Sequence, residues 1–180
     1  MSLVSNLFLL FVAASILIYY IVPRKSQWIV LLIFSYLYYI AGGPRYVVFI
    51  LFSTLVTWLM ALLIEKAEGK ENHKGARKLL ILGLILNFGM LGIVKYTNFA
   101  VENINALLHL NLRGIQLLLP LGISFYTFQS SGYLLDVYWK RCKAERQPLK
   151  YALFVSFFPQ ILQGPIGRYS RLADQLYAEH

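Results

Sequence analysis

Residues 117–138 read LLLPLGISFYTFQSSGYLLDVY, and residues 157–169 read FFPQILQGPIGRY. Both stretches place polar side chains, prolines and glycines inside sequence that is otherwise apolar. Polar and irregular backbone is costly in a membrane unless protein buries it or it lines a water-filled cavity. The remainder of the chain must therefore be arranged around these two stretches.

The composition predicts an integral membrane protein. Of 180 residues, 58% are hydrophobic and 14% charged, against about a quarter charged in a typical soluble domain. The net charge of +9 would suggest nucleic-acid binding in a soluble protein. Here the basic residues gather in short segments between apolar runs, so they indicate membrane topology, and we expect no nucleic-acid partner.

Five apolar runs are candidates for membrane spans, since about 20 helical residues cross ~30 Å of hydrocarbon. The sequence therefore predicts an all-α, polytopic transmembrane bundle in a single domain over residues 1–180. We expect a soluble loop at 65–78, an interfacial amphipathic helix at 95–113 and a broken, re-entrant segment at 151–166. The expected spans are 3–22, 27–42, 46–64, 79–95 and 115–139.

Basic residues fix the expected orientation. Twelve of the 17 lie at 24–25, 65–78 and 140–150, which alternation of the spans places on one side, whereas three lie on the other. Cytoplasmic loops carry such an excess. The first run is expected to be a retained span with its N-terminus outside, because no basic residue precedes it.

Residues 123–138 carry the first group of candidate site residues. Tyr126, Gln129, Tyr133 and Asp136 are spaced by three, four and three, so they share one helix face. One interpretation is hydrogen bonding between helices, with Asp136 paired to Lys140. The other is the polar lining of a substrate tunnel.

Residues 159–168 carry the second group. Pro159, Gly164 and Pro165 disturb the backbone and free carbonyl groups that need partners. Gln160 and Gln163 could satisfy those carbonyls or face a substrate. Arg168 could hold an anionic group or end a span at the lipid headgroups.

Other chemistry finds little support in the residues. Cys142 is the single cysteine, which excludes an internal disulfide, and His73, His109 and His180 show no metal-ligand spacing. No nucleophile constellation or phosphate-binding loop is present. The residues alone leave a transporter and a membrane enzyme open.

Three segments resemble the membrane-bound O-acyltransferase (MBOAT) family, in its alginate O-acetylase-like branch. They are LPLGISFYTFQ at 119–129, YLLDVY at 133–138, and FFPQ with GPI-x-RY over 157–169. The resemblance implies a multi-helix bacterial inner-membrane enzyme with a central tunnel. It implies transfer of an acyl group, expected to be acetyl, to hydroxyls of an extracytoplasmic polysaccharide such as alginate.

The resemblance also implies an acyl donor, partners and a catalytic histidine that lies outside residues 1–180. The donor would be acetyl-CoA or another acyl thioester, with no bound cofactor or metal, and membrane lipid and an extracytoplasmic esterase-like protein would be partners. The family's catalytic histidine is expected beyond residue 180, so none of the three histidines takes that role and residues 1–180 alone are expected to be inactive. The tunnel-lining candidates are Tyr126, Gln129, Asp136, Pro159, Gln160, Gln163, Gly164, Pro165 and Arg168. A D-alanyl-type MBOAT of teichoic acid modification, a transporter or flippase, and a non-catalytic scaffold are the alternatives.

Overall fold

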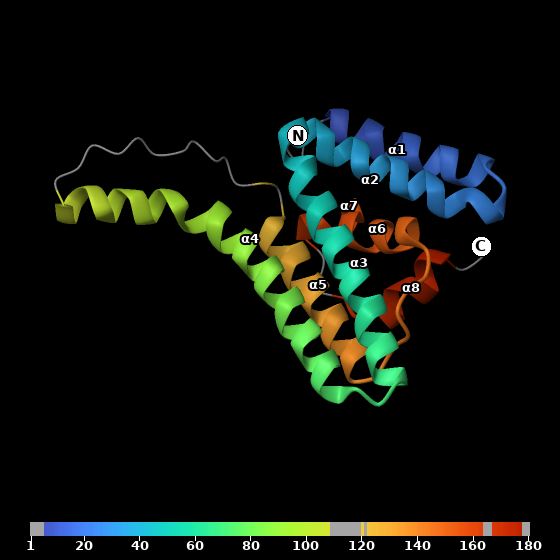
Figure 1. Ribbon diagram of the computed structural model, residues 1–180. Coiled ribbons are helices and arrows are strands. Elements are labelled where there is room, and N and C mark those ends of the chain that lie inside the picture. The colour runs from blue at the N-terminus through green and yellow to red at the C-terminus, as the bar shows by residue number, and fades with distance from the viewer. Residues whose placement is uncertain (1–5, 109–119, 121, 164–166, 178–180) are drawn as a thin grey trace.

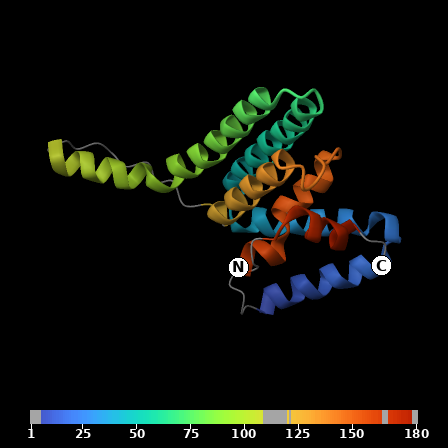
Figure 2. The ribbon, with the colours of Figure 1, turned by 90° about the horizontal axis from the view of Figure 1, so that it is seen from below.

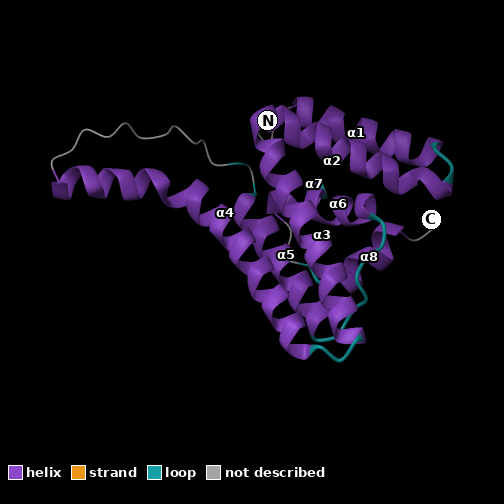
Figure 3. Cartoon of the chain, in the orientation of Figure 1, coloured by secondary structure: helices purple, strands orange, loops and turns teal. Residues whose placement is uncertain are grey.

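The computed structural model describes residues 6–108, 120, 122–163 and 167–177. Within these ranges the regular structure is helical and contains no strand, which confirms the predicted all-α class. Figure 3 shows these helices and the short loops that join them. The helices are α1 (Asn6–Ile21), α2 (Gln27–Gly42), α3 (Val47–Gly69), α4 (His73–Leu108), α5 (Ile123–Tyr138), α6 (Pro148–Ser156), α7 (Phe158–Gln163) and α8 (Tyr169–Tyr177), with 3-10 turns at η1 (Arg24–Ser26) and η2 (Pro44–Tyr46).

Helices α3, α4 and α5 lie side by side and form a bundle (Figure 1). Helix α1 packs along α2, and α2 in turn packs on α6 and α7, with α8 against α6. The second half of α4 extends away from all other described helices (Figure 2). Of the two stretches that the sequence singled out, the first therefore forms a helix of the bundle, α5, and the second contributes α7, which packs on α2.

Two segments, Pro44–Gly69 and His73–Thr97, are long and apolar enough to cross a membrane, and α1 is a shorter apolar helix. Large apolar side chains project outward from the helices; Leu10, Leu17 and Ile93 are each about two-thirds exposed. Lipid tails are as apolar as leucine, so such surfaces suit a bilayer. The apolar helices thus support the membrane character that the composition predicts.

A buried polar network joins α3 to α4. The Asn87 side chain is fully buried; it accepts from Ser53 Oγ at 2.6 Å and donates to Thr57 Oγ1 at 2.9 Å and to the Gly83 carbonyl at 3.0 Å. Burying an amide is favourable only when its polar atoms are paired, as they are here. Asn87 thus bonds between α4 and α3.

Two expected boundaries are wrong. Helices α3 and α4 occupy most of the expected loop at 65–78 and leave only Lys70–Asn72 as a turn. Its many charged residues are good helix formers, so they extend the helices beyond the apolar runs. The expected separate helix at 95–113 is instead the continuation of α4 to Leu108, because no proline or other helix-breaking signal interrupts it.

Two glutamates of α3 hold the basic 140–150 segment. Glu65 accepts from the Ala144 backbone N–H at 3.1 Å and from Arg146 at 2.5 Å, and Glu68 pairs with Lys140 at 3.1 Å. His73 Nδ1 lies 2.9 Å from Glu68 Oε2, so this exposed side chain also contacts Glu68. The loop after α5 is therefore tied to the end of α3.

Candidate functional site

The two motif-bearing stretches meet at the start of α5. Gly122 precedes this helix with φ +69°, a left-handed conformation that favours glycine. A Cβ placed on Gly122 would lie 2.5 Å from Cγ2 of Ile161 in α7. Glycine is thus required both by the turn and by the close approach of α7.

The predicted broken segment is interrupted at Phe157, between α6 and α7, where ψ is 104°. The Phe158 N–H cannot reach the Phe154 carbonyl as a continuous helix would require, and it donates to Ser35 Oγ of α2 at 3.3 Å. Pro159 lies in the first turn of α7, where a missing N–H costs nothing. The break therefore falls directly before Pro159, in the segment that the sequence predicted to be broken.

Gln129 of α5 satisfies the carbonyl that this break frees. Its Nε2 donates to the Phe154 carbonyl at 3.2 Å and to Gln160 Oε1 at 3.2 Å. The side chain is only 2% exposed, and its Oε1 has no protein partner among the described residues. A buried unpaired acceptor costs about 1–3 kcal/mol, so this oxygen is an unfavourable feature of the fold as it stands.

A polar cavity of about 150 Å³ opens beside Gln129, between α5 and the beginning of α8. Asp136 and Arg168 line it, so the structure brings together three of the predicted site residues. Gly132 also lines the cavity, and a Cβ placed there would meet nothing within 4 Å. The other lining residues are Tyr133, Leu135, Trp139, Gly167 and Tyr169.

Asp136 has a different charge partner from the expected one. Arg141 Nη1 lies 3.6 Å from Asp136 Oδ1, and Lys140 pairs with Glu68 instead. The backbone N–H groups of Arg141 and Cys142 both donate to the Asp136 carbonyl, which turns the chain at the end of α5. The turn places Lys140 beside α3 and leaves the Asp136 carboxylate at the cavity.

Aromatic rings form the floor beside the cavity. The ring centroids of Tyr133 and Tyr169 are 4.8 Å apart, and those of Tyr133 and Tyr151 are 4.7 Å apart. The Tyr169 hydroxyl donates to Glu145 Oε2 at 2.5 Å. Burial, followed by the bond to this carboxylate, raises the pKa of Tyr169 above its usual value, so the hydroxyl keeps its proton.

The remaining predicted residues have different positions. Tyr126 is buried against Tyr39, with ring centroids 6.5 Å apart, and does not line the cavity. Pro159 is exposed, and Gln160 does not line the cavity but contacts two residues that do: it bonds to Gln129, and its Nε2 would lie 2.9 Å from a Cβ placed on Gly167. Gln163 ends α7 but its side chain lies outside the described residues, as do Gly164 and Pro165.

Sequence reasoning missed Gly132 and Glu145. Gly132 lies three residues after Gln129, and this spacing places it on the same face as the predicted residues. Glu145 is the single acidic residue in the basic segment 140–150. Both residues could therefore have been singled out from the sequence.

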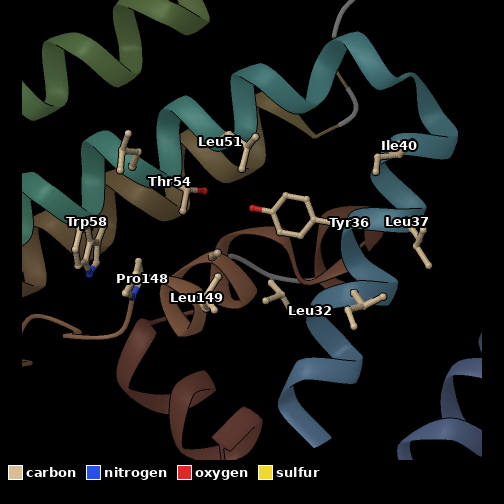
Figure 4. A pocket seen from close by; sticks show the side chains of 12 residues that line it. Leu32, Tyr36, Leu37, Ile40, Leu51, Thr54, Trp58, Pro148 and Leu149 are labelled. Atoms are coloured by element: carbon tan, nitrogen blue, oxygen red, sulfur yellow. The ribbon is translucent and has the colours of Figure 1, made fainter. Parts of the chain in front are cut away.

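A larger groove of about 570 Å³ lies elsewhere, between α2, α3 and α6. Apolar side chains line most of it, and the hydroxyls of Tyr36 and Thr54 point toward one another across it (Figure 4). Of the lining residues, none is ionisable except Tyr36. The groove can hold an apolar chain but offers no carboxylate, guanidinium or amide side chain, and it includes none of the predicted site residues, so we take the smaller cavity as the candidate site.

Sequence comparison finds curated relatives across nearly the whole chain. It is 36% identical over 178 residues to the "Probable alginate O-acetylase AlgI" of Pseudomonas syringae pv. tomato, covering 95% of this chain and 34% of that protein. Identity to the protein of the same name from Pseudomonas aeruginosa is 34% with the same coverage. The "Peptidoglycan O-acetyltransferase" of Helicobacter pylori is 33% identical over 172 residues, covering 82% of this chain and 32% of that protein.

The chain thus spans about a third of the length of the curated relatives it matches. No family model and no solved structure matches it. Similarity to these relatives extends over all the described helices and is not confined to the two motif-bearing stretches.

Proposed function

We propose that this chain, a homologue of alginate O-acetylases over 95% of its length, forms part of a membrane enzyme that transfers acetyl groups to hydroxyls of an extracytoplasmic polysaccharide. The homology confirms the resemblance to the alginate O-acetylase-like branch that residues 119–138 and 157–169 predicted. The relatives named above are all O-acetylating enzymes, and the names of their acceptors, alginate and peptidoglycan, both denote polysaccharide-containing polymers. A transporter and a teichoic acid D-alanylating enzyme are not favoured.

The polar cavity between α5 and α8 is the observation that carries this proposal. It lies where the two family-like stretches meet, and it gathers an amide, a carboxylate and a guanidinium from Gln129, Asp136 and Arg168. Convergent polar groups in a concave site are typical of binding and catalytic sites. We assign the residues that line this cavity to the wall of a tunnel in which the reacting groups meet.

The chemistry needed is attack of a polysaccharide hydroxyl oxygen on the carbonyl carbon of an acetyl thioester such as acetyl-CoA. The C–O ester bond forms, the C–S bond breaks, and the hydroxyl proton passes to a base. That base is the family histidine, which we place outside this chain. Negative charge develops on the carbonyl oxygen, and the guanidinium N–H groups of Arg168 are the cavity's candidate donors to it.

For topology we propose five spans, built on helices α1 to α5, in the bacterial inner membrane with the N-terminus outside. Support comes from the Lys70–Asn72 turn and the loop after α5, which lie at the same end of the bundle (Figure 1) and are joined through Glu65 and Glu68. The helix ends that flank this turn and the loop after α5 both carry the basic residues typical of the cytoplasmic side. The α6–α7 pair would then be the re-entrant segment, and the second half of α4 would lie at the outer interface with lipid. An extracytoplasmic esterase-like protein is the proposed partner.

Alanine substitutions in the whole protein test this function. We expect Arg168→Ala and Asp136→Ala, which remove the two charged groups that line the cavity, to lower the acetyl-ester content of the polysaccharide about tenfold or more, because one lost charge-assisted bond is worth about 1.5–3 kcal/mol. Arg171→Ala is the matched control, since Arg171 is exposed on α8 and does not line the cavity. Esters would be measured in a bacterial host that lacks its own acetylase, alongside membrane levels of each variant. Wild-type ester content in both test variants would remove the cavity from the proposal.

A further inference from the structure

Glu145 lies between α5 and α6, and four of its polar groups are bonded. Its backbone N–H donates to the Tyr133 hydroxyl at 2.8 Å, and its carbonyl accepts from Trp58 Nε1 at 2.9 Å. In the side chain, Oε1 accepts from the Gln147 backbone N–H at 2.8 Å and Oε2 accepts from the Tyr169 hydroxyl at 2.5 Å. Three of these bonds reach separate helices: α5 through Tyr133, α3 through Trp58 and α8 through Tyr169.

Two of these bonds reach cavity-lining residues that belong to different helices. Tyr133 belongs to α5 and Tyr169 begins α8, and both line the cavity. Arg168 and Gly167, which precede Tyr169 directly, line it as well. A single residue outside the cavity therefore holds the hydroxyl groups of both tyrosines.

The loop that carries Glu145 is itself anchored. Trp58 connects it to the middle of α3, and Glu65, two turns farther along α3, binds the backbone of Ala144 and the side chain of Arg146. Both neighbours of Glu145 in the chain are thus fixed to α3. Hydrogen bonds to a carboxylate are about twice as strong as neutral ones, so the Tyr169 bond is the strong connection to the α8 wall.

We infer that Glu145 is a positioning residue that sets the width of the cavity by holding the α8 wall, through Tyr169, at a fixed distance from α5. The catalytic consequence rests on the proposed function, because only a working cavity makes its width matter for transfer. The mechanical part does not depend on it and can be tested without any substrate.

The rate at which a thiol in the cavity reacts with a reagent reports the width of the cavity. Gly132→Cys places a thiol in the open space of the cavity, and Cys142→Ser removes this chain's only other thiol. With the whole protein otherwise free of cysteine, the reaction of residue 132 with a small methanethiosulfonate reagent is timed in membranes. Tyr169→Phe, which removes one hydroxyl, and Glu145→Gln, which replaces one of two acceptors with a donor, should each raise the rate about tenfold or more.

Tyr177→Phe is the matched control. Tyr177 is also on α8, but its hydroxyl donates to the Lys150 carbonyl at 2.5 Å rather than to Glu145. Its loss should leave the rate at residue 132 unchanged. The double variant Tyr169→Phe with Glu145→Gln should be no faster than the faster single variant, because both changes break the same bond.

Acetyl transfer, measured in protein that keeps Gly132, gives a second test. We expect Tyr169→Phe to raise KM for the donor about tenfold with a smaller change in kcat, because a displaced wall weakens binding before chemistry. Unchanged thiol rates in both Tyr169→Phe and Glu145→Gln would overturn the inference. Raised thiol rates together with no acetyl transfer by the wild-type protein would leave the positioning role standing and overturn the proposed function instead.

Discussion

Replacing Gly132 with leucine should abolish acetyl transfer without damaging the fold. Gly132 lies on α5 between Gln129 and Asp136, and it lines the cavity of about 150 Å³. No heavy atom lies within 4 Å of the position where a Cβ would be built. A leucine side chain can therefore enter the cavity without first displacing protein atoms.

The expected effects on stability and activity have opposite signs. Glycine inside a helix is less favourable than alanine or leucine by about 0.5–1 kcal/mol, so Gly132→Leu should leave the folded protein as stable or slightly more stable. In contrast, four added carbon atoms would occupy space that a reacting group needs. Misplacement of reacting groups by about 1 Å can cost ~100-fold in rate, so we expect a loss of transfer of at least that size.

The assay is acetyl transfer by the purified whole protein in proteoliposomes, with thermal unfolding measured on the same samples. Gly89→Leu is the matched control: Gly89 also has nothing within 4 Å of a built Cβ, but it lines an apolar groove between α3 and α4. That variant should transfer acetyl groups normally. Wild-type transfer by Gly132→Leu, with normal insertion and stability, would refute the assignment of the cavity.

Three further predictions concern the scaffold. Asn87→Ala should destabilise the protein by about 1–3 kcal/mol, measured by unfolding in detergent, because it removes three buried bonds between and within α3 and α4; an unchanged midpoint would contradict this. Burial, followed by the carboxylates of Asp136 and Glu65, raises the pKa of the Cys142 thiol to about 11. The alkylation rate of Cys142 should therefore be ~300-fold lower near pH 7 than that of an ordinary thiol, and it should rise about tenfold per pH unit up to roughly pH 10. A rate that levels off near pH 9 would contradict this prediction. Lys70→Cys should react with a membrane-impermeant maleimide only in permeabilised cells, and labelling of intact cells would reverse the topology.

Helix positions followed from the sequence where an apolar run coincides with the helix. The run at 27–42 coincides with α2, and Gly43 ends it with φ +147°, where a Cβ would lie 2.5 Å from the Tyr46 ring. The run at 79–95 located α4 but not its ends, because hydropathy reports burial in lipid whereas helices continue into charged sequence. Residues 73–78 and 96–108 are helical for that reason.

The site was predictable in its composition but not in its contacts. Helical spacing placed Gln129 and Asp136 on one face, and both line the cavity with Arg168. The partner of Asp136 depended on the turn after α5, which aims Lys140 at Glu68 and leaves Arg141 for Asp136. Glu145 joins parts of the chain as distant as Trp58 and Tyr169, and no local pattern encodes pairs so far apart.

Transfer of a labelled acetyl group from acetyl-CoA or another acetyl thioester to purified polysaccharide, by the purified whole protein in liposomes, tests the central claim most directly. The account predicts labelled O-acetyl esters with wild-type protein and a loss of about tenfold or more with Gln129→Leu, which removes the buried amide but keeps the side-chain bulk. Equal transfer by wild type and Gln129→Leu, or no labelled ester with either acetyl donor, would contradict it.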